Sequence, residues 1–577
     1  MVMRSLALGI AFFFVASNAH AADHYVDNAA SGSNDGSSWA DAWKSFKDID
    51  WGTVQPGETI YVSGGGDTKT YLEQLTVGKS GAAGSPITVA AGRYSSSPSG
   101  HDGRVVIDGG GTGSQSIYVQ NKSYVTLKGF ECTNAQKGIY VEDNADTIVL
   151  DSMDIHDFRG QAGIMLNGAS SYTVENVTIQ NSKIVAPEMY DAETDAIYIQ
   201  RAQRTTIHDN YIHQRNQDPK AHTDALQAYL ASGFVIYNNY LINDSVYSPE
   251  GGGTPIILGS EGTNPVVIYN NFLYMGGIWD PSGNHNSALW TRWYDNDPMP
   301  PTWVIHNTIV VAGPRCRDFI QEYDAVTVNN ILAIFNAGES LANLEESLPH
   351  PIPVDKTRNN LFWRSSGGPG FSGQFTGNGQ TGSVSGWTSW VNDYGGTGVN
   401  ADPLFVDDFI HTFGDGTDEG ALNGELQAGS PAIDQGEDAK PLIDTLNSTY
   451  GLSLPWTDIN GNPRDNTPTI GAYEYCEGAA CAKPDGGAGT GGGGGTGGGG
   501  LDAGAGTGGG AGLDGGAGTG GSNAGTGGST GNGASSSDDG GCGCRMERWS
   551  PVDGLLALVA LCGLGLFTRR RRRTRRW

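Results

Sequence analysis

Two segments of the chain begin alike and carry carboxylates that could bind a metal ion. They read Glu193-Thr-Asp-Ala-Ile197 and His222-Thr-Asp-Ala-Leu226, so Asp195 and Asp224 occupy equivalent places. Carboxylate oxygens are the ligands that Ca²⁺ prefers, and we predict that Glu193, Asp195 and Asp224 bind Ca²⁺. In the alternative interpretation, the two aspartates cap turns by accepting hydrogen bonds from nearby backbone N–H groups.

The loop at 213–222 leads into the second segment and concentrates cationic side chains. Cleavage of a uronic-acid polymer by β-elimination removes the proton beside a carboxylate. The negative charge that develops must be stabilised by cations or a metal ion, and a base must accept the proton. Arg215, Lys220 and His222 are therefore the candidate catalytic residues. A solvated loop without a catalytic role is the alternative.

Aromatic, amide and guanidinium side chains lie next to the apolar residues of these and neighbouring segments. Side chains alternate across a β-strand, so the neighbours of inward-pointing residues such as Ile197 and Leu226 must point outward. An arginine on such a face can hold a substrate carboxylate with two hydrogen bonds. The candidate substrate-binding residues on this predicted sugar platform are Tyr198, Gln227, Tyr229, Trp290 and Arg292.

A repeat that runs from about 127 to 335 positions these side chains. No window keeps the 3.6-residue apolar period over the ten or more residues that a helix needs. Repeats of this length predict a solenoid, and their β-rich composition makes it an all-β parallel β-helix. The units begin at Leu127, Leu150, Ile179, Ile207, Ile236, Ile268, Val304 and Thr327.

An asparagine stands at the fourth position of most of these units. Stacked coils would place the asparagines above one another, and side-chain amides in register can hydrogen-bond along the stack. We therefore predict an asparagine ladder; the alternative is that each asparagine merely marks a separate turn. The residues are Asn210, Asn239, Asn271, Asn307 and Asn330.

The segment before the repeat predicts a cap for the open end of the solenoid, because terminal repeats need a cover. We expect an amphipathic helix over about Trp39–Ile49. The succession His24-Tyr-Val-Asp27, Pro56-Gly-Glu-Thr-Ile-Tyr-Val62 and Val105-Val-Ile-Asp-Gly109 resembles the opening of pectate-lyase-like, right-handed parallel β-helix proteins, which include extracellular polysaccharide lyases. The resemblance runs from about residue 24 to 335. It implies the fold and an action on polysaccharide, although many chemistries share this scaffold.

The segment 401–475 carries Asp402-Pro-Leu-Phe405, Ser430-Pro-Ala-Ile-Asp434 and Asp458-Ile-Asn-Gly-Asn-Pro-Arg464. This set resembles the closing segment of surface β-helix proteins that carry varied C-terminal anchors. We interpret it as the C-terminal coils and cap of one domain that spans 22–475, after a further coil at Asn359–Phe362. A separate small domain is the alternative.

The N-terminal residues 1–21 read as a secretory signal, with Arg4, an apolar run and a small-residue cleavage site. In the segment 476–541, Cys476 and Cys481 are predicted to form a disulfide, and a Gly-rich tether follows. Cys132 and Cys316 lie on distant repeats and are predicted to be buried single thiols.

The last segment, 542–577, holds Cys542 and Cys544, an apolar run at Gly554–Phe567 and seven arginines. This order resembles the myxobacterial C-terminal sorting tail. The resemblance implies processing near one of the two cysteines, contact with sorting machinery and the membrane, and attachment to the cell surface. A permanent transmembrane anchor is the alternative.

The charge of the chain excludes one class of partner. The whole sequence has 34 basic and 62 acidic residues; without 1–21 and 542–577, which hold ten basic and two acidic residues, 24 and 60 remain, a net charge near −36. Nucleic-acid binding uses basic patches and is not expected. We predict an exported, monomeric surface protein that binds extracellular polysaccharide, with a Ca²⁺-assisted polysaccharide lyase as the leading chemical version. A non-catalytic adhesin or glycan-binding rod and a glycoside hydrolase are the alternatives.

Overall fold

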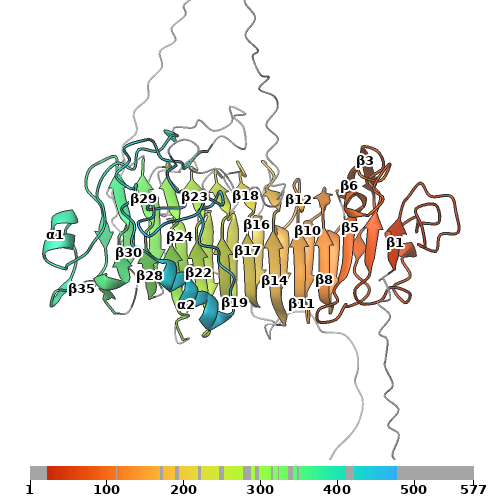
Figure 1. The fold of residues 1–577 in the computed structure, drawn as a ribbon, viewed down its shortest axis with the longest axis horizontal. Helices are drawn as coiled ribbons and strands as arrows, with labels where there is room; N and C mark the ends of the chain where they lie inside the picture. The colour runs from red at the N-terminus through yellow and green to blue at the C-terminus, as the bar shows by residue number, and fades with distance from the viewer. Residues whose placement is uncertain are drawn as a thin grey trace, which may run out of the picture. The chain divides into compact units, whose positions relative to one another are not determined.

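The structure is a computed structural model, and it describes residues 22–111, 113–168, 173–188, 194–218, 223–245, 253–276, 287–292, 298–313, 316–322, 324–335, 342–346, 348, 350–409 and 422–476. Its strands stack in parallel, coil upon coil (Figure 1). After the first strand, each coil contributes one strand to each of three sheets, which we name A, B and C. The predicted all-β, right-handed parallel β-helix is thereby confirmed.

Sheet A contains the strands in which most repeat units begin. Its strands are β1 (Asp23–Val26), β2 (Thr59–Val62), β5 (Ile87–Ala91), β8 (Ser123–Lys128), β11 (Asp146–Asp151), β14 (Val174–Gln180), β17 (Ala202–His208), the second half of β19 (Leu226–Tyr237), β22 (Val266–Tyr269), β25 (Thr302–Ile305), β28 (Ala325–Val328) and β32 (Thr357–Arg358).

Sheet B follows sheet A in each coil after a short turn. Its strands are β3 (Thr68–Tyr71), β6 (Arg104–Asp108), β9 (Phe130–Thr133), β12 (Asp154–Ile155), β15 (Lys183–Val185), β18 (Tyr211–Gln214), β20 (Tyr240–Asn243), β23 (Phe272–Met275), β26 (Thr308–Val311), β29 (Ile331–Ile334) and β33 (Leu361–Arg364).

Sheet C carries the predicted substrate face. Its strands are β4 (Leu75–Thr76), β7 (Gln115–Gln120), β10 (Lys137–Glu142), β13 (Ala162–Asn167), β16 (Asp195–Gln200), the first half of β19, β21 (Ile256–Ser260), β24 (Ser287–Arg292), β27 (Arg317–Gln321), β30 (Leu344–Glu346) and β34 (Phe371–Ser372). A small sheet of β31 (Ile352–Pro353), β35 (Phe375–Gly377) and β36 (Gln380–Gly382) lies near the last coils.

The register of the coils follows the repeat. The first residue of each unit pairs with the first residue of the next, from Leu127 with Leu150 to Val304 with Thr327. In sheet C, Ile139, Ile164, Ile197, Leu226, Ile256 and Leu289 form one continuous inward row, and all are fully buried. A repeated pattern of apolar residues therefore becomes a continuous core along the solenoid.

The predicted asparagine ladder is confirmed, and it extends by one coil. Each Nδ2 donates to the Oδ1 of the next asparagine at 2.9–3.0 Å, from Asn210 to Asn360. The residue before each rung has a positive φ, such as 56° at Asp209 and 55° at Asn238. Asn and Asp tolerate this left-handed conformation better than most residues, and they occupy five of the six positions before the rungs; the sixth is His306.

At the N-terminal end, the predicted helix over Trp39–Ile49 is wrong. Only a 3₁₀ turn, η1 (Phe46–Asp48), is helical. The backbone N–H of Trp43 donates to Tyr25 O of strand β1, and the N–H of Asp27 donates to Trp43 O. The chain here pairs with the first strand instead of with itself. Trp43 and Phe46 are nevertheless buried against the first coils, so the segment covers the end without forming a helix.

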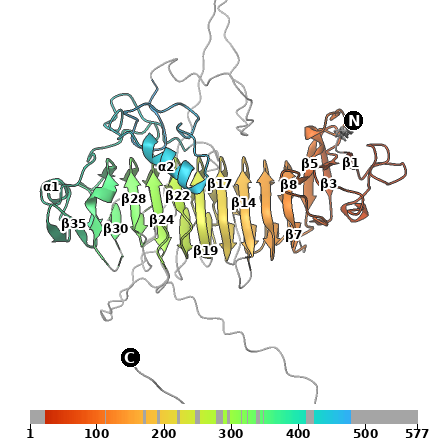
Figure 2. The same cartoon turned by 60° about the horizontal axis from the view of Figure 1, so that its bottom comes forward.

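At the C-terminal end, the described residues after β36 form no further coils. The prediction that 401–475 adds coils to the solenoid is therefore also wrong. Two helices occur there, α1 (Trp387–Asn392) and α2 (Lys440–Tyr450). Elsewhere in the described chain, two further 3₁₀ turns are η2 (Gly92–Tyr94) and η3 (Val354–Lys356). The segment 399–409 and 422–476, which we call the C-terminal strap, returns over the coils (Figures 1 and 2). It packs on sheet B through Phe405, Phe409, Ile470 and Tyr473, and on sheet A through Ile443 and Leu446 of α2.

Cys132 and Cys316 are buried and form no disulfide, as predicted. Cys476 is disulfide-bonded; its predicted partner, Cys481, lies outside the described residues, as do the predicted signal, tether and tail with Cys542 and Cys544. Within the described ranges, no helix is long and apolar enough to cross a membrane.

Candidate functional site

The outward face of sheet C carries two rows of side chains in register. One row runs through Tyr118, Tyr140, Met165, Tyr198, Gln227, Ile257, Trp290 and Ile320. The second, two residues further along each strand, contains Gln120, Glu142, Asn167, Gln200 and Tyr229, and Arg292 lies opposite Gly259. The predicted substrate residues therefore lie on one face, and its rings and amides stand about 4.7–4.9 Å apart per coil.

The first coils of this face hold a hydrogen-bonded cluster that the sequence analysis missed. The Tyr118 hydroxyl donates to Glu142 Oε1, and Asn167 Nδ2 donates to the Tyr140 hydroxyl at 3.0 Å. Lys137 Nζ lies 5.0 Å from the centre of the Tyr140 ring, and burial lowers the pKa of Lys137. Burial likewise raises the pKa of Tyr140 to about 12, so this tyrosine stays a neutral hydrogen-bonding group at physiological pH.

The far end of the face holds Trp290 and Arg292. Trp290 Nε1 donates to Glu322 Oε1 at 2.9 Å, and the Arg292 guanidinium lies 5.6 Å from the Trp290 ring centre. Both side chains are half-buried. The contacts hold ring and guanidinium in place, which reduces the conformational entropy that binding a ligand would cost.

The two predicted metal ligands on this sheet cap backbone groups. Asp195 Oδ1 accepts a hydrogen bond from the N–H of Asp224 at 2.8 Å, and Asp224 Oδ1 accepts from the N–H and hydroxyl of Thr254. Asp195 and Asp224 are 2% and 0% exposed. They therefore link three successive coils where these enter sheet C, and one oxygen of each carboxylate already accepts a backbone hydrogen bond.

The predicted catalytic loop is only partly described. Arg215 Nε donates to Ala186 O at 3.2 Å, so Arg215 ties two successive loops together. Glu193, Lys220 and His222 lie outside the described residues, and their assignments stay predictions. Nearby, His213 Nε2 lies 2.8 Å from Asp244 Oδ2.

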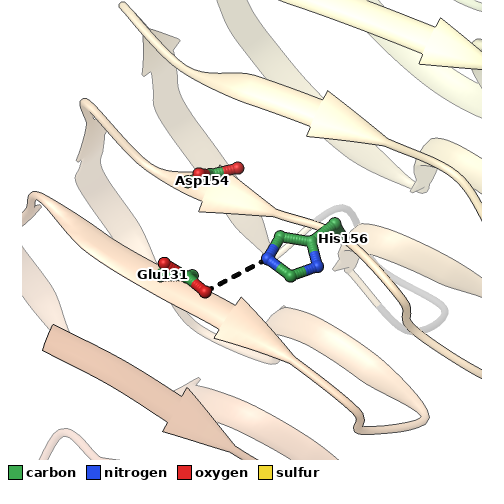
Figure 3. Close-up of side chains that lie close together, drawn as sticks. All are labelled: Glu131, Asp154 and His156. Atoms are coloured by element: carbon green, nitrogen blue, oxygen red, sulfur yellow. Dashed lines mark hydrogen bonds and ion pairs between the residues drawn. The ribbon is translucent and has the colours of Figure 1, made fainter. Parts of the chain in front are cut away.

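A separate cluster on the outward face of sheet B was not predicted. Glu131 of β9, Asp154 of β12 and His156, directly after β12, have ligand-type atoms within 4.8 Å of one another (Figure 3). Glu131 and Asp154 are paired in register. His156 Nε2 lies 3.3 Å from Glu131 Oε1, and Arg104 of β6 donates to the other Glu131 oxygen. A signal existed: Glu131 and Asp154 both stand at the fifth position of their repeat units.

The contacts within the cluster shift the pKa values of its three titrating groups in different directions. The hydrogen bond to Glu131 raises the pKa of His156 to about 9. The bond to His156 and the ion pair with Arg104 lower the pKa of Glu131. Burial raises the pKa of Asp154, against which the charges of His156 and Lys183 act. Two neighbouring carboxylates with opposite pKa shifts are a common feature of functional sites.

Comparison with known proteins agrees with this architecture. Residues 105–280 match the family model described as "Right handed beta helix region". No curated protein matches the chain. Among solved structures, the chain is similar to the pectate lyase Pel9A (18% identity, TM-score 0.44, covering 78% of this chain and 96% of that one) and to XylC in complex with xylose (11%, 0.41, 79% and 98%). It is also similar to PfbA, a surface adhesin of Streptococcus pneumoniae (13%, 0.34, 57% and 83%). At these identities and TM-scores, the similarities to solved structures carry no conclusion about the activity of this chain.

Proposed function

We propose that this protein binds an extracellular polysaccharide along the outward face of sheet C, and that it cleaves the polymer by β-elimination. The observation that supports this proposal best is the pair of registered rows between Tyr118 and Arg292. Half-buried rings offer flat apolar faces to sugar rings, and their polar tips remain able to hydrogen-bond. A face that repeats with each coil suits a ligand that is itself a repeating chain.

The lyase version requires cations close to a substrate carboxylate. Arg292 and Lys137, at opposite ends of the described face, supply positive charge on a chain whose overall charge is strongly negative. In this version Arg215, Lys220 or His222 stabilises the developing charge or accepts the proton.

Ca²⁺ remains the expected cofactor of the lyase version, since its positive charge would stabilise the carbanion-like transition state. Asp195 and Asp224 fit it only in part, because each already accepts a backbone hydrogen bond with Oδ1. A Ca²⁺ ion takes six to eight oxygen ligands. Asp195 and Asp224 would therefore contribute their second oxygens, together with Glu193.

The proposal includes export and attachment at the cell surface. It rests on the signal-like residues 1–21, the Gly-rich tether and the Cys-apolar-Arg ending of 542–577. The partners are then an extracellular polysaccharide and the machinery that processes the tail, and the protein acts as a monomer. The acidic net charge argues against nucleic acid.

The test is incubation of the purified protein with a panel of acidic polysaccharides, with and without Ca²⁺. We expect the ultraviolet absorbance of unsaturated uronides to appear with at least one polymer. Release of reducing sugar without that absorbance would assign a glycoside hydrolase instead. Binding without either product would assign a non-catalytic adhesin, and no binding to any polymer would refute the proposal.

Point variants locate the site. Lys220→Ala or His222→Ala should lower turnover by about 10²–10⁴-fold if either residue is the base. Trp290→Ala should weaken binding with little effect on the melting temperature. Tyr94→Ala is the control, because Tyr94 is 38% exposed and stacks with Arg93 and Lys128 away from sheet C. Equal losses in Trp290→Ala and Tyr94→Ala would contradict the assignment of sheet C.

A further inference from the structure

Within the described part of the chain, one cluster has the composition of a transition-metal site. It is the group of Glu131, Asp154 and His156 on sheet B, where the three ligand-type atoms lie within 4.8 Å of one another. The cluster stands on a different sheet from the proposed polysaccharide face. The three residues come from two adjacent coils whose backbones are hydrogen-bonded in register, so the scaffold that positions them is rigid.

His156 is oriented as metal-binding histidines usually are. Asp157 Oδ2 lies 2.8 Å from His156 Nδ1, which leaves Nε2 facing Glu131. A carboxylate on the second ring nitrogen fixes the tautomer and the ring orientation of a ligating histidine. Asp157 has a φ of 51°, a conformation that turns the chain so that its carboxylate reaches back to the ring.

The Glu131 side chain is positioned in a similar way. Arg104 holds one carboxylate oxygen, and the other, Oε1, lies 3.3 Å from His156 Nε2. Two tetrahedral zinc ligands at about 2.0–2.1 Å from the ion stand roughly 3.3 Å apart. The separation between these two atoms therefore already matches that of a shared metal ion.

Asp154 is the third residue of the cluster. No described side chain or backbone group donates a hydrogen bond to its carboxylate, although the residue is only partly exposed. Lys183, its partner on the next coil, is the nearest competing cation by register. A carboxylate held in register with Glu131 and lacking a donor is free to rotate onto an ion at Nε2 and Oε1.

We propose that Glu131, Asp154 and His156 bind a divalent first-row transition metal, with Zn²⁺ the best match. One imidazole and two carboxylates form a mixed nitrogen and oxygen donor set. Such sets suit Zn²⁺, whereas Ca²⁺ takes six to eight oxygens. The bound ion would join the coils of β9 and β12, with Arg104 and Asp157 as outer partners.

The chain offers a matched control in His208 and Asp209. His208 Nδ1 lies 2.6 Å from Asp209 Oδ2, and Asp209 has a φ of 56°, so the local histidine–aspartate pair is the same. Its neighbours on adjacent coils are Gln180 and Tyr237 instead of carboxylates, and its ring stacks on Tyr237. His208 therefore has the oriented ring without the other two ligands.

The experiment is calorimetric titration of the chelator-treated full chain with Zn²⁺, with Co²⁺ absorption as a second readout of a tetrahedral site. We expect one Zn²⁺ equivalent that excess Ca²⁺ does not displace. Asp154→Asn and His156→Gln should each weaken it by at least 100-fold, and Asp157→Asn by 10–100-fold. His208→Gln should leave it unchanged. Circular dichroism checks that each variant is folded.

Two outcomes would overturn the proposal: no Zn²⁺ binding by the folded wild-type protein, or the same binding in wild type, Asp154→Asn and His156→Gln. The second outcome would place bound Zn²⁺ at other residues of the chain, among which histidines and cysteines are the usual ligands. Because the readout is metal binding, the result is independent of whether sheet C binds or cleaves polysaccharide.

Discussion

The first and second halves of the solenoid differ in what their outward faces carry. On sheet B, the fifth position of successive repeat units is Glu131, Asp154, Lys183, Tyr211, Tyr240, Phe272, Thr308 and Ile331. On sheet A, the second position is Lys128, Asp151, Gln180, His208, Tyr237, Tyr269, Ile305 and Val328. Both rows change from charged to apolar along the chain.

The C-terminal strap explains the change. Phe272 and Ile331 are buried against the strap on sheet B, and Tyr269 and Ile305 are buried against it on sheet A. The same strand geometry therefore accepts either kind of side chain at these positions. Contact with the strap decides which one is stable, because apolar side chains gain from leaving water and charged ones do not.

Truncation of a covered side chain should have the largest effect. Phe272 is fully buried and lies against Phe409 and Tyr473 of the strap. We expect Phe272→Ala to lower the free energy of unfolding by about 3–5 kcal/mol, because it removes apolar burial and leaves a cavity. Lys183→Ala, in the same row but exposed, should change it by less than about 0.5 kcal/mol. Urea denaturation measures both, and equal losses would show that the strap contributes no stability.

The second prediction compares a fully buried aspartate, Asp224, with a partly exposed one, Asp154, and expects an effect of intermediate size on stability. Asp224→Ala should cost about 1–3 kcal/mol, because it leaves the buried N–H of Thr254 without an acceptor. Asp154→Asn, on the open half of sheet B, should cost less than about 0.5 kcal/mol in the presence of a chelator. If Asp224→Ala keeps full stability but removes a Ca²⁺ response of activity, the metal-ligand interpretation is correct and the capping interpretation is wrong.

The smallest expected effect is the pH dependence of the stability that His156 and Glu131 contribute, in the half of sheet B that the strap does not cover. His156 has a folded-state pKa raised to about 9 by Glu131, above its ordinary value of about 6.5. The stability that this pair contributes is fully present below pH about 6.5, while Glu131 is ionised, and is lost as the pH rises through about 9. In chelator, the difference in melting temperature between wild type and His156→Gln should therefore shrink from pH 6 to pH 10. A difference that is constant over this range would contradict the ion pair.

Much of the solenoid can be predicted from the sequence. The repeat sets the register, because residues at the same position of successive units stack when the coils are closed. The asparagine ladder, the inward row of sheet C and the outward position of Tyr198, Gln227 and Trp290 all follow from that one condition. The buried state of Cys132 follows too, since it occupies the sixth, inward position of its unit.

Part of the charged cluster on sheet B could also have been predicted from the repeat. Glu131 and Asp154 share the fifth position, so their proximity is encoded in the repeat. The first units match the repeat weakly, so the pattern of later units did not point to this position. Arg104 lies before the repeat and His156 after its last matching residue, so their contacts with Glu131 needed the folded coils.

The sequence by itself determined the period, the strand type and the residues that stack, since these depend on local geometry repeated many times. The tertiary structure alone decided the course of the segments that do not repeat. Trp39–Ile49 pairs with β1 because the open strand edge satisfies its backbone, and the strap follows the apolar half of sheets A and B instead of adding coils. Such segments have no period to fix their place. Trp43 is positioned by Tyr25 and Asp27 of the first coil, and the strap by contacts with residues more than a hundred positions away, such as that of Tyr269 with Pro455.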